Sequence, residues 1–167
     1  ADAKRARAAA HNLGCAFGDR VFCARVDDGS LEHPDLAGAF DFAQLVQVLG
    51  HVPMKSVSSS LRAMRHVLAD DHGVLLCALP FAGTRMDLFF VTRLDDDGVV
   101  RPRQVDVATF DARARDPREH ELPVRHFSMT SVLTAFTAAG FVVDKTEPYH
   151  WFSHDTGDLF VVARKRP

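Results

Sequence analysis

The chain has 167 residues, of which 47% are hydrophobic and 25% are charged, and its formal net charge is −2. This balance is typical of a soluble globular protein and excludes wholesale disorder. The small net charge argues against a nucleic-acid binder driven by bulk electrostatics, and no apolar run approaches the ~20 residues that a membrane helix needs.

The first half of the chain alternates helical and extended patterns. We predict a helix over residues 2–13 and a strand over 20–26, which is short, β-rich and bounded by turn residues. A second strand is expected over 40–46, where a near-continuous apolar run suits a strand buried in a parallel sheet. Apolar residues at steps of four, three and four then predict a helix over 53–70. A third buried strand is expected over 74–79.

The second half begins with a segment of different character, because residues 82–126 are rich in arginine and acidic side chains of balanced charge. We interpret this segment as an insertion that forms a surface subdomain or lid, and a solvated loop is the alternative. Ser128 is a good N-cap for a following helix. Strands are expected over 141–146 and 158–164, joined by a loop at 147–157, so that they pair antiparallel.

This order of elements predicts one α/β domain over residues 1–167, because buried strands alternate with amphipathic helices. The sheet is expected to be mostly parallel. The final antiparallel pair of strands would lie at one edge of it.

Several segments in this order resemble one family. Four of them resemble the fourth to seventh strands of class I S-adenosylmethionine-dependent methyltransferases. They are the stretch FDFAQLVQVLGHVP at residues 40–53, the helix-to-strand passage that ends in Gly73-Val74-Leu75-Leu76, the passage AAGFVV at 138–143 and the closing FVVARK at 160–165. Residues 19–28 are similar to the third strand of that family and the acidic residue after it. The resemblance implies a Rossmann-like methyltransferase sandwich with an antiparallel final strand.

The resemblance implies S-adenosylmethionine as cofactor and methyl transfer to a small-molecule acceptor. The family's glycine-rich loop follows its first strand, and this sequence has no strand followed by G-x-G. We therefore expect the chain to lack the first strand or strands, to carry an incomplete cofactor site and to be part of a longer chain. A homodimer or a partner chain that completes the sheet is also possible on this pattern. The alternative function is a non-catalytic methyltransferase-like scaffold or regulatory subunit.

The same resemblance implies six cofactor-binding positions. Three follow the strand at 20–26 and would lie near the adenine, and three lie at the end of the strand at 40–46 and would line the methionine part: Asp27, Asp28, Gly29, Leu45, Val46 and Gln47. Ordinary turn chemistry is the alternative for Asp27 and Asp28. Core packing is the alternative for Leu45, whereas a polar side chain at Gln47 favours exposure to a cleft at the carboxyl ends of the strands.

Two further sites are predicted around histidine and aromatic residues. His51 stands where the family often carries a histidine and is the candidate general base. A loop histidine that hydrogen-bonds the backbone is the alternative. Tyr149 and Trp151, the chain's only Tyr and Trp, are candidate substrate contacts, with a local hydrophobic plug as the alternative. No metal site is expected, because His150 and His154 are four apart in a loop and not on a helix.

The cysteines indicate a cellular location. Cys15, Cys23 and Cys77 are odd in number and form no C-x-x-C, which fits a reducing compartment better than a disulfide framework. The first ten residues lack the apolar core of a secretory signal. We expect a cytoplasmic protein, with an organelle as the alternative.

Overall fold

The computed structural model describes residues 31–166 apart from 96 and 154, so the helix predicted over 2–13 and the strand predicted over 20–26 lie outside the described residues. A 3-10 turn at Pro34–Leu36 leads into the first described strand. Four strands then form the main sheet in the order β1-β2-β7-β6. Their bounds are β1 Phe42–Val46, β2 Val74–Ala82, β6 Phe141–Trp151 and β7 Thr156–Lys165.

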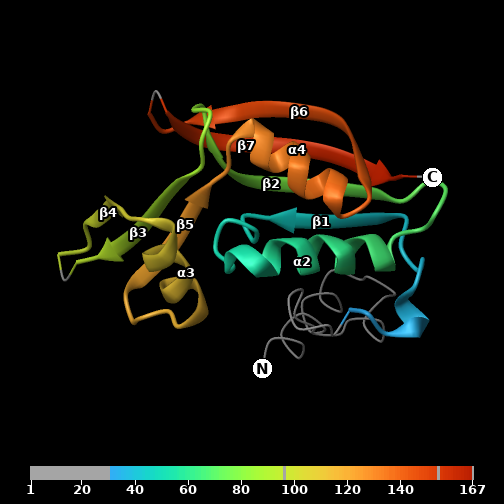
Figure 1. Cartoon of the computed structure of the whole chain (residues 1–167), viewed down its shortest axis with the longest axis horizontal. Helices are drawn as coiled ribbons and strands as arrows, with labels where there is room; N and C mark the ends of the chain where they lie inside the picture. The colour runs from blue at the N-terminus through green and yellow to red at the C-terminus, as the bar shows by residue number, and fades with distance from the viewer. Residues whose placement is uncertain (1–30, 96, 154, 167) are drawn as a thin grey trace, which may run out of the picture.

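The directions of these strands agree with the predicted topology. Strands β1 and β2 are parallel, and β7 runs antiparallel to both of its neighbours, β2 and β6. The first three strands in chain order therefore point the same way, and only the last is reversed. The antiparallel pair occupies one edge of the sheet (Figure 1).

Two helices cover one face of the main sheet, namely α2 (Met54–Val67) and α4 (Met129–Ala138). The inward stripe of α2 carries Val57, Leu61 and Met64, all buried and all at the spacing that predicted the helix. These side chains meet the alternate residues of the strands that point to the same face. The core so formed includes Leu75, Phe136, Phe141, Leu159 and Val161, each no more than 1% exposed.

The opposite face of the main sheet is not covered by any helix of the described residues. Phe42, Val46 and Val142 point to this face and are 52%, 49% and 41% exposed. Strand β1 is thus half-buried, whereas its apolar run predicted burial on both sides. The sequence of β1 has the apolar pattern of a buried strand, but the described residues pack against only one of its two faces.

The final hairpin corrects the prediction of a loop over 147–157. Strand β6 continues to Trp151 and β7 begins at Thr156, so a short turn joins two long strands. Pro148 suggested a break, but β6 is an edge strand and its register shifts beside Pro148, where a missing N–H is tolerated. Gly157 allows the strands to approach, since a Cβ there would lie 2.2 Å from the carbonyl oxygen of His150.

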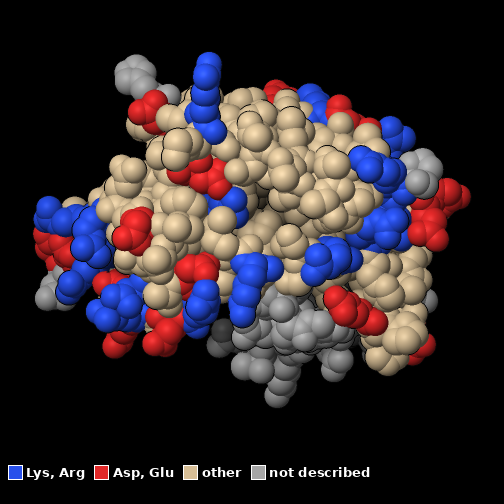
Figure 2. All heavy atoms as spheres, in the orientation of Figure 1, with Lys and Arg blue, Asp and Glu red and all other residues tan. Residues whose placement is uncertain are grey.

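The segment predicted as an insertion contains a second sheet with the strand order β4-β3-β5. Its elements are β3 Leu88–Leu94, β4 Val100–Gln104, α3 Val107–Arg115 and β5 Glu121–His126. Phe81 and Phe127 are bridged, so the segment leaves and rejoins the main sheet at one place. It is a folded subdomain and not a solvated loop. Figure 2 shows charges of both signs interspersed over its outer end, where Arg101 pairs with Asp95.

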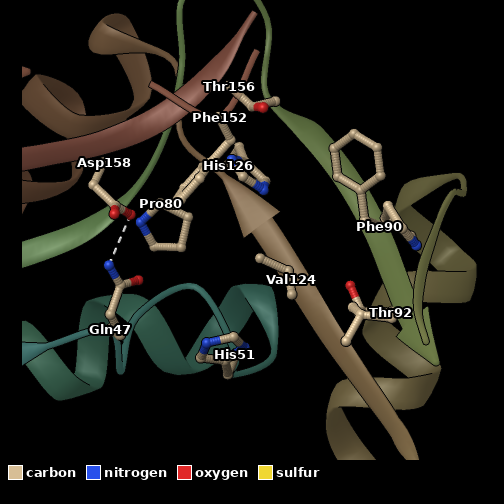
Figure 3. Close-up of a pocket in the computed structure, with 12 residues that line it drawn as sticks. Gln47, His51, Pro80, Phe90, Thr92, Val124, His126, Phe152, Thr156 and Asp158 are labelled. Atoms are coloured by element: carbon tan, nitrogen blue, oxygen red, sulfur yellow. Dashed lines mark hydrogen bonds between the residues drawn. The ribbon is translucent and has the colours of Figure 1, made fainter. Parts of the chain in front are cut away.

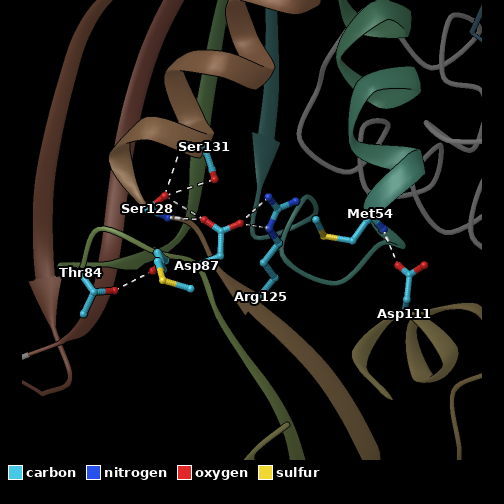
Figure 4. Close-up of polar contacts among 8 residues, drawn as sticks. Met54, Thr84, Asp87, Asp111, Arg125, Ser128 and Ser131 are labelled. Carbon is cyan, nitrogen blue, oxygen red and sulfur yellow. Dashed lines mark hydrogen bonds and ion pairs between the residues drawn. The ribbon is translucent and has the colours of Figure 1, made fainter. Parts of the chain in front are cut away.

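A buried ion pair within the insertion lies where this second sheet meets the start of α4 (Figure 4). The Arg125 guanidinium on β5 donates two hydrogen bonds to Oδ2 of Asp87, at 2.8 and 2.5 Å, and Arg125 is only 7% exposed. Oδ1 of the same carboxylate accepts hydrogen bonds from the backbone N–H and the hydroxyl of Ser128, at 2.8 and 3.0 Å. Burial opposes ionisation of Asp87, but the Ser128 N–H, the Ser131 hydroxyl and Arg125 outweigh it and hold its pKa below the ordinary value.

A second carboxylate of the insertion reaches the other helix. Oδ1 of Asp111 on α3 accepts a hydrogen bond of 2.7 Å from the backbone N–H of Met54, the first residue of α2 (Figure 4). Asp87 makes the corresponding contact at Ser128, the N-cap of α4. Free N–H groups and the positive end of the helix dipole favour a carboxylate at both positions. The insertion therefore docks on the N-terminal ends of both helices.

The Arg125→Met variant should be strongly destabilised, because it leaves the Asp87 carboxylate buried without its cation. Removing one partner of a buried ion pair costs about 3–5 kcal/mol of unfolding free energy. Urea denaturation measures this loss. The matched control is Lys145→Met, which removes the cation of the exposed Lys145–Glu147 pair and should cost only a small fraction as much. Equal effects of the two substitutions would contradict a structural role of the buried pair.

Candidate functional site

A cavity of about 440 Å³ lies between the main sheet and the second sheet, where β1 ends and β7 begins (Figure 3). We call it the edge cavity. The end of the main sheet contributes one wall, with Gln47, His51, Pro80, Thr156 and Asp158. The second sheet and the β6–β7 turn contribute the facing wall, with Phe90, Thr92, Val124, His126 and Phe152. The cavity is thus at the carboxyl ends of β1 and β2, where open α/β sheets bind ligands.

Gln47 enters the cavity directly after β1. Its φ of 56° is unusual for a residue other than glycine, and its backbone N–H donates to the Ala78 carbonyl at 2.7 Å. Its side-chain Nε2 donates to Oδ1 of Asp158 at 2.8 Å, and Asp158 is only 7% exposed. Because a carboxylate only accepts hydrogen bonds, this contact turns the amide oxygen of Gln47 away from Asp158, toward the space of the cavity (Figure 3).

His51 lies on the loop between β1 and α2 and contacts the second sheet. Its Nδ1 is 2.7 Å from the carbonyl oxygen of Pro123 on β5. A carbonyl can only accept, so Nδ1 carries the proton, and in the neutral ring Nε2 is a free acceptor. The backbone contact predicted as an alternative is therefore present, and the side chain also lines the cavity. The contact orients the ring and leaves its other nitrogen available.

The close approach of this loop to β5 depends on Gly50. A Cβ at this position would lie 2.7 Å from Cγ of Pro80 and 3.2 Å from the carbonyl oxygen of Arg125. The carbonyl of Gly50 also accepts the backbone N–H of Arg125 at 2.8 Å. A side chain at residue 50 would push the loop away from β5 and move His51 with it.

His126 on β5 is the second histidine of the cavity. Burial lowers its pKa and outweighs the opposite effects of the Phe81 carbonyl and Asp158, and nearby His51 adds a small further lowering. Its Nδ1 is 3.4 Å from the Phe81 carbonyl oxygen, and its ring meets the Phe90 ring edge-on at 5.3 Å. The ring is therefore held neutral near neutral pH. Its position among apolar groups is the physical cause.

The two predicted aromatic substrate contacts lie outside the walls of the edge cavity. Tyr149 packs edge-on against Phe160, and Trp151 packs edge-on against Phe81. Both are strand residues of β6 and about half exposed. Phe152, the next residue along the chain, does line the cavity. The role of Tyr149 and Trp151 as substrate contacts stays a prediction that this geometry does not favour.

The six predicted cofactor-binding residues lie in different parts of the chain's structure. Asp27, Asp28 and Gly29 lie outside the described residues. Leu45 is 5% exposed on the helix-covered face, which is a packing position, and Val46 points to the open face of the main sheet. Among these six residues and His51, the structure brings Gln47 and His51 together at the edge cavity. Their roles stay predictions.

Sequence reasoning missed most of the side chains that line this site, among them Asp158, Phe90 and His126. Asp158 was expected only as the first residue of a strand, although an acidic residue there is unusual enough to be a signal. Phe90 and His126 belong to the insertion, whose sequence shows no periodic pattern that would mark a cavity wall. Across residues 31–166 as described, no group of three His, Cys, Asp or Glu side chains is arranged to hold a metal ion. No described helix combines the length and apolar character needed to cross a bilayer.

Comparisons with known proteins give a fold but no close relative. Neither the protein-family models nor the curated proteins contain a match to this chain. Among solved structures, this chain is similar to the 1,6-didemethyltoxoflavin-N1-methyltransferase of Burkholderia thailandensis, which was solved with 1,6-didemethyltoxoflavin and S-adenosylhomocysteine. The two align with a TM-score of 0.55 and 16% sequence identity, and the alignment covers 82% of this chain and 48% of that one. An S-adenosylmethionine-dependent methyltransferase of Methanosarcina mazei aligns with a TM-score of 0.55 and 16% identity, over 78% and 61%.

A third similar solved structure is a cyclase and not a methyltransferase by name. The 4+2 cyclase SpnF aligns with a TM-score of 0.56 and 17% identity, over 95% of this chain and 60% of that protein. The chain thus spans about half to three fifths of the length of these structures. At such identities the comparisons show the fold, which is that of class I S-adenosylmethionine-dependent methyltransferases, and they confirm the predicted fold class.

The lowered pKa of His126 predicts how stability depends on pH. The unfolded chain takes up a proton below the ordinary histidine pKa of about 6.5, whereas folded His126 resists protonation, so its contribution destabilises the fold as pH falls below that value. His126→Gln should therefore lose less stability than the parent when urea denaturation is compared at about pH 7.5 and about pH 5.

The control for this experiment is His72→Gln, whose expected effect has the opposite sign. The hydrogen bonds that His72 donates to the carboxylates of Asp41 and Asp71 raise the pKa of this exposed histidine, so the group stabilises the fold below the ordinary histidine pKa. The variant without it should lose more stability than the parent on acidification. The same pH dependence in His126→Gln and the parent would contradict the assignment of a neutral buried ring.

Proposed function

We propose that this chain is part of an S-adenosylmethionine-dependent methyltransferase that acts on a small molecule bound in the edge cavity. The fold supports the general reaction, and the observation that carries the proposal is the placement of Gln47 and His51. Both follow β1 and line a cavity that the second sheet covers from the other side. A ligand-binding edge closed by a subdomain suits a small acceptor better than a macromolecule.

The described residues fit one side of the cofactor. Val46 offers an exposed apolar side chain at the end of β1, directly before Gln47. Leu45 does not fit, because it is buried in the core on the other face. The residues expected to hold the adenine end, Asp27 and Asp28, lie outside the described part of the chain. When bound, the cofactor supplies a methyl group whose bond to the sulfonium sulfur breaks as the acceptor's lone pair attacks it.

The chain's own residues then hold the acceptor and take its proton. In its neutral form the His51 ring can accept a proton at Nε2, because its Nδ1 donates to the Pro123 carbonyl. An acceptor O–H or N–H that reaches Nε2 gives its proton to His51 as the new bond to carbon forms. Orientation in the cavity contributes the larger share of the rate, because the methyl donor is already activated.

A second candidate function is a non-catalytic scaffold or regulatory subunit with the same fold. The open face of the main sheet favours it, since Phe42 and Val46 expose apolar surface on which another chain or a second copy could pack. The alignment with a 4+2 cyclase also shows that this fold is not tied to one activity.

We also propose a cytoplasmic location. The basis is the odd number of cysteines in the chain, of which Cys77 is a free and buried thiol.

Binding of S-adenosylhomocysteine separates these two functions. Isothermal titration into the full-length protein should show saturable one-to-one binding. Val46→Glu should weaken it by about ten-fold or more, because a charge then replaces an apolar contact. The matched control is Gln44→Glu, two residues earlier on the same face of β1, which should change the affinity little. No binding to the full-length protein would contradict the methyltransferase proposal and favour the scaffold.

His51→Gln tests the catalytic role. The amide of glutamine can still donate to the Pro123 carbonyl but cannot accept a proton, so the loop should stay in place while the base is lost. Methyl transfer to an acceptor should fall by about 10²–10⁴-fold, the usual contribution of a general base. Binding of S-adenosylhomocysteine should be unchanged. An unaltered turnover number would show that His51 only holds the loop.

A further inference from the structure

The edge cavity has a one-sided chemical character. None of the described residues that line it is lysine or arginine, and its one ionisable acid is Asp158. The carboxylate of Asp158 is buried and holds the Gln47 amide. An anionic ligand would therefore find no lysine or arginine among the described lining residues and would have a carboxylate nearby. Such a charge would lose its hydration without compensation.

Three of the polar side chains that line the cavity present hydrogen-bond acceptors to it, whereas the hydroxyls of Thr92 and Thr156 can donate as well as accept. The Asp158 carboxylate takes the amide N–H of Gln47 and so presents the amide oxygen to the cavity. The Pro123 carbonyl takes the Nδ1 proton of His51 and so leaves its Nε2 bare. His126 is neutral, and its Nδ1 faces the Phe81 carbonyl, so its Nε2 is also an acceptor. In each case an acceptor behind the side chain decides which atom faces the ligand.

Apart from Thr92 and Thr156, the remaining described side chains that line the cavity are apolar, and two of them are flat aromatic rings. Phe90 stands against His126 on the second sheet, and Phe152 on the β6–β7 turn is 60% exposed and reaches the same cavity. Pro80 and Val124 add apolar surface between the polar atoms (Figure 3). A volume of about 440 Å³ is in the range of sites that bury a drug-sized molecule. Flat rings fill such a space well, because aromatic side chains pack on them with stacked or edge-on geometry.

We propose that the edge cavity selects an uncharged aromatic or heteroaromatic acceptor that carries hydrogen-bond donors, such as a phenol or a ring N–H, and rejects carboxylates and phosphates. This inference rests on the proposed function only in calling the ligand a methyl acceptor. The ligand selectivity that it describes depends on the cavity alone. The donor group of the ligand reaches Gln47 and His51, and its rings lie between Phe90 and Phe152. The group that donates to His51 is the one that would lose its proton.

Three naphthalene probes of one shape test the proposal: 2-naphthol, which donates a hydrogen bond, 2-methoxynaphthalene, which does not, and 2-naphthoate, which is anionic. Isothermal titration into the protein without cofactor measures their affinities. We expect 2-naphthol to bind about ten-fold or more tightly than each of the other two, the size of one well-formed hydrogen bond or one uncompensated charge. Equal or tighter binding of 2-naphthoate would overturn the proposal.

Variants locate the probe. His51→Phe keeps a flat ring but removes the acceptor, so 2-naphthol should fall to the affinity of 2-methoxynaphthalene. Phe152→Ala changes an exposed side chain that the fold does not require, and it should weaken 2-naphthol and 2-methoxynaphthalene alike. The matched control is Phe42→Ala on the open face of the main sheet, also half exposed, which should have no effect. An effect of Phe42→Ala as large as that of Phe152→Ala would place the probe outside the cavity and contradict the proposal.

The two proposals fail in different ways. If 2-naphthol binds as expected while the full-length protein does not bind S-adenosylhomocysteine, the selectivity of the cavity stands and methyl transfer is wrong. If the protein binds S-adenosylhomocysteine but prefers 2-naphthoate, methyl transfer stands and the acceptor class is wrong.

Discussion

The buried ion pair of Asp87 and Arg125 is the constraint on which the site depends. The edge cavity has two walls, and the second sheet that forms one of them belongs to an insertion in the main sheet. Arg125 lies on β5, within this second sheet, and Asp87 precedes β3 and also receives the N-terminus of α4 at Ser128. The backbone N–H of Arg125 binds Gly50, next to His51. One residue thus fixes the facing wall and the loop of the candidate base together.

The insertion contacts the N-terminal ends of two helices through carboxylates. Asp87 and Asp111 each place a carboxylate at the first turn of a helix, α4 in one case and α2 in the other. Each contact satisfies backbone donors that a helix cannot satisfy itself. Docking of the subdomain and the start of both helices are therefore coupled. The cavity forms only where both helices, both sheets and the joining loop have reached their final places.

In the candidate site, a carboxylate and a backbone carbonyl orient the two polar side chains that follow β1. Asp158 orients Gln47, and the Pro123 carbonyl orients His51. Orientation before binding lowers the cost of ordering these groups around a ligand. Because the fold is shared by methyltransferases and by a 4+2 cyclase, the fold alone does not name a reaction. In our proposal, the chemical character of these oriented groups restricts the ligand.

Local pattern in the sequence determined the elements whose residues meet the core at a regular spacing. The helix expected over 53–70 and the strand expected over 40–46 are present as α2 and β1, and their order with the later strands was enough for the fold class. The tertiary structure decided the rest. The hydrogen bond between Gln47 and Asp158 joins residues that are 111 positions apart in the sequence. The aromatic residues at 149–151, which the sequence predicted in a loop, belong to β6, because an edge strand tolerates Pro148. Such contacts carry no local periodicity, since they depend on which segments fold against one another, and only the folded chain shows them.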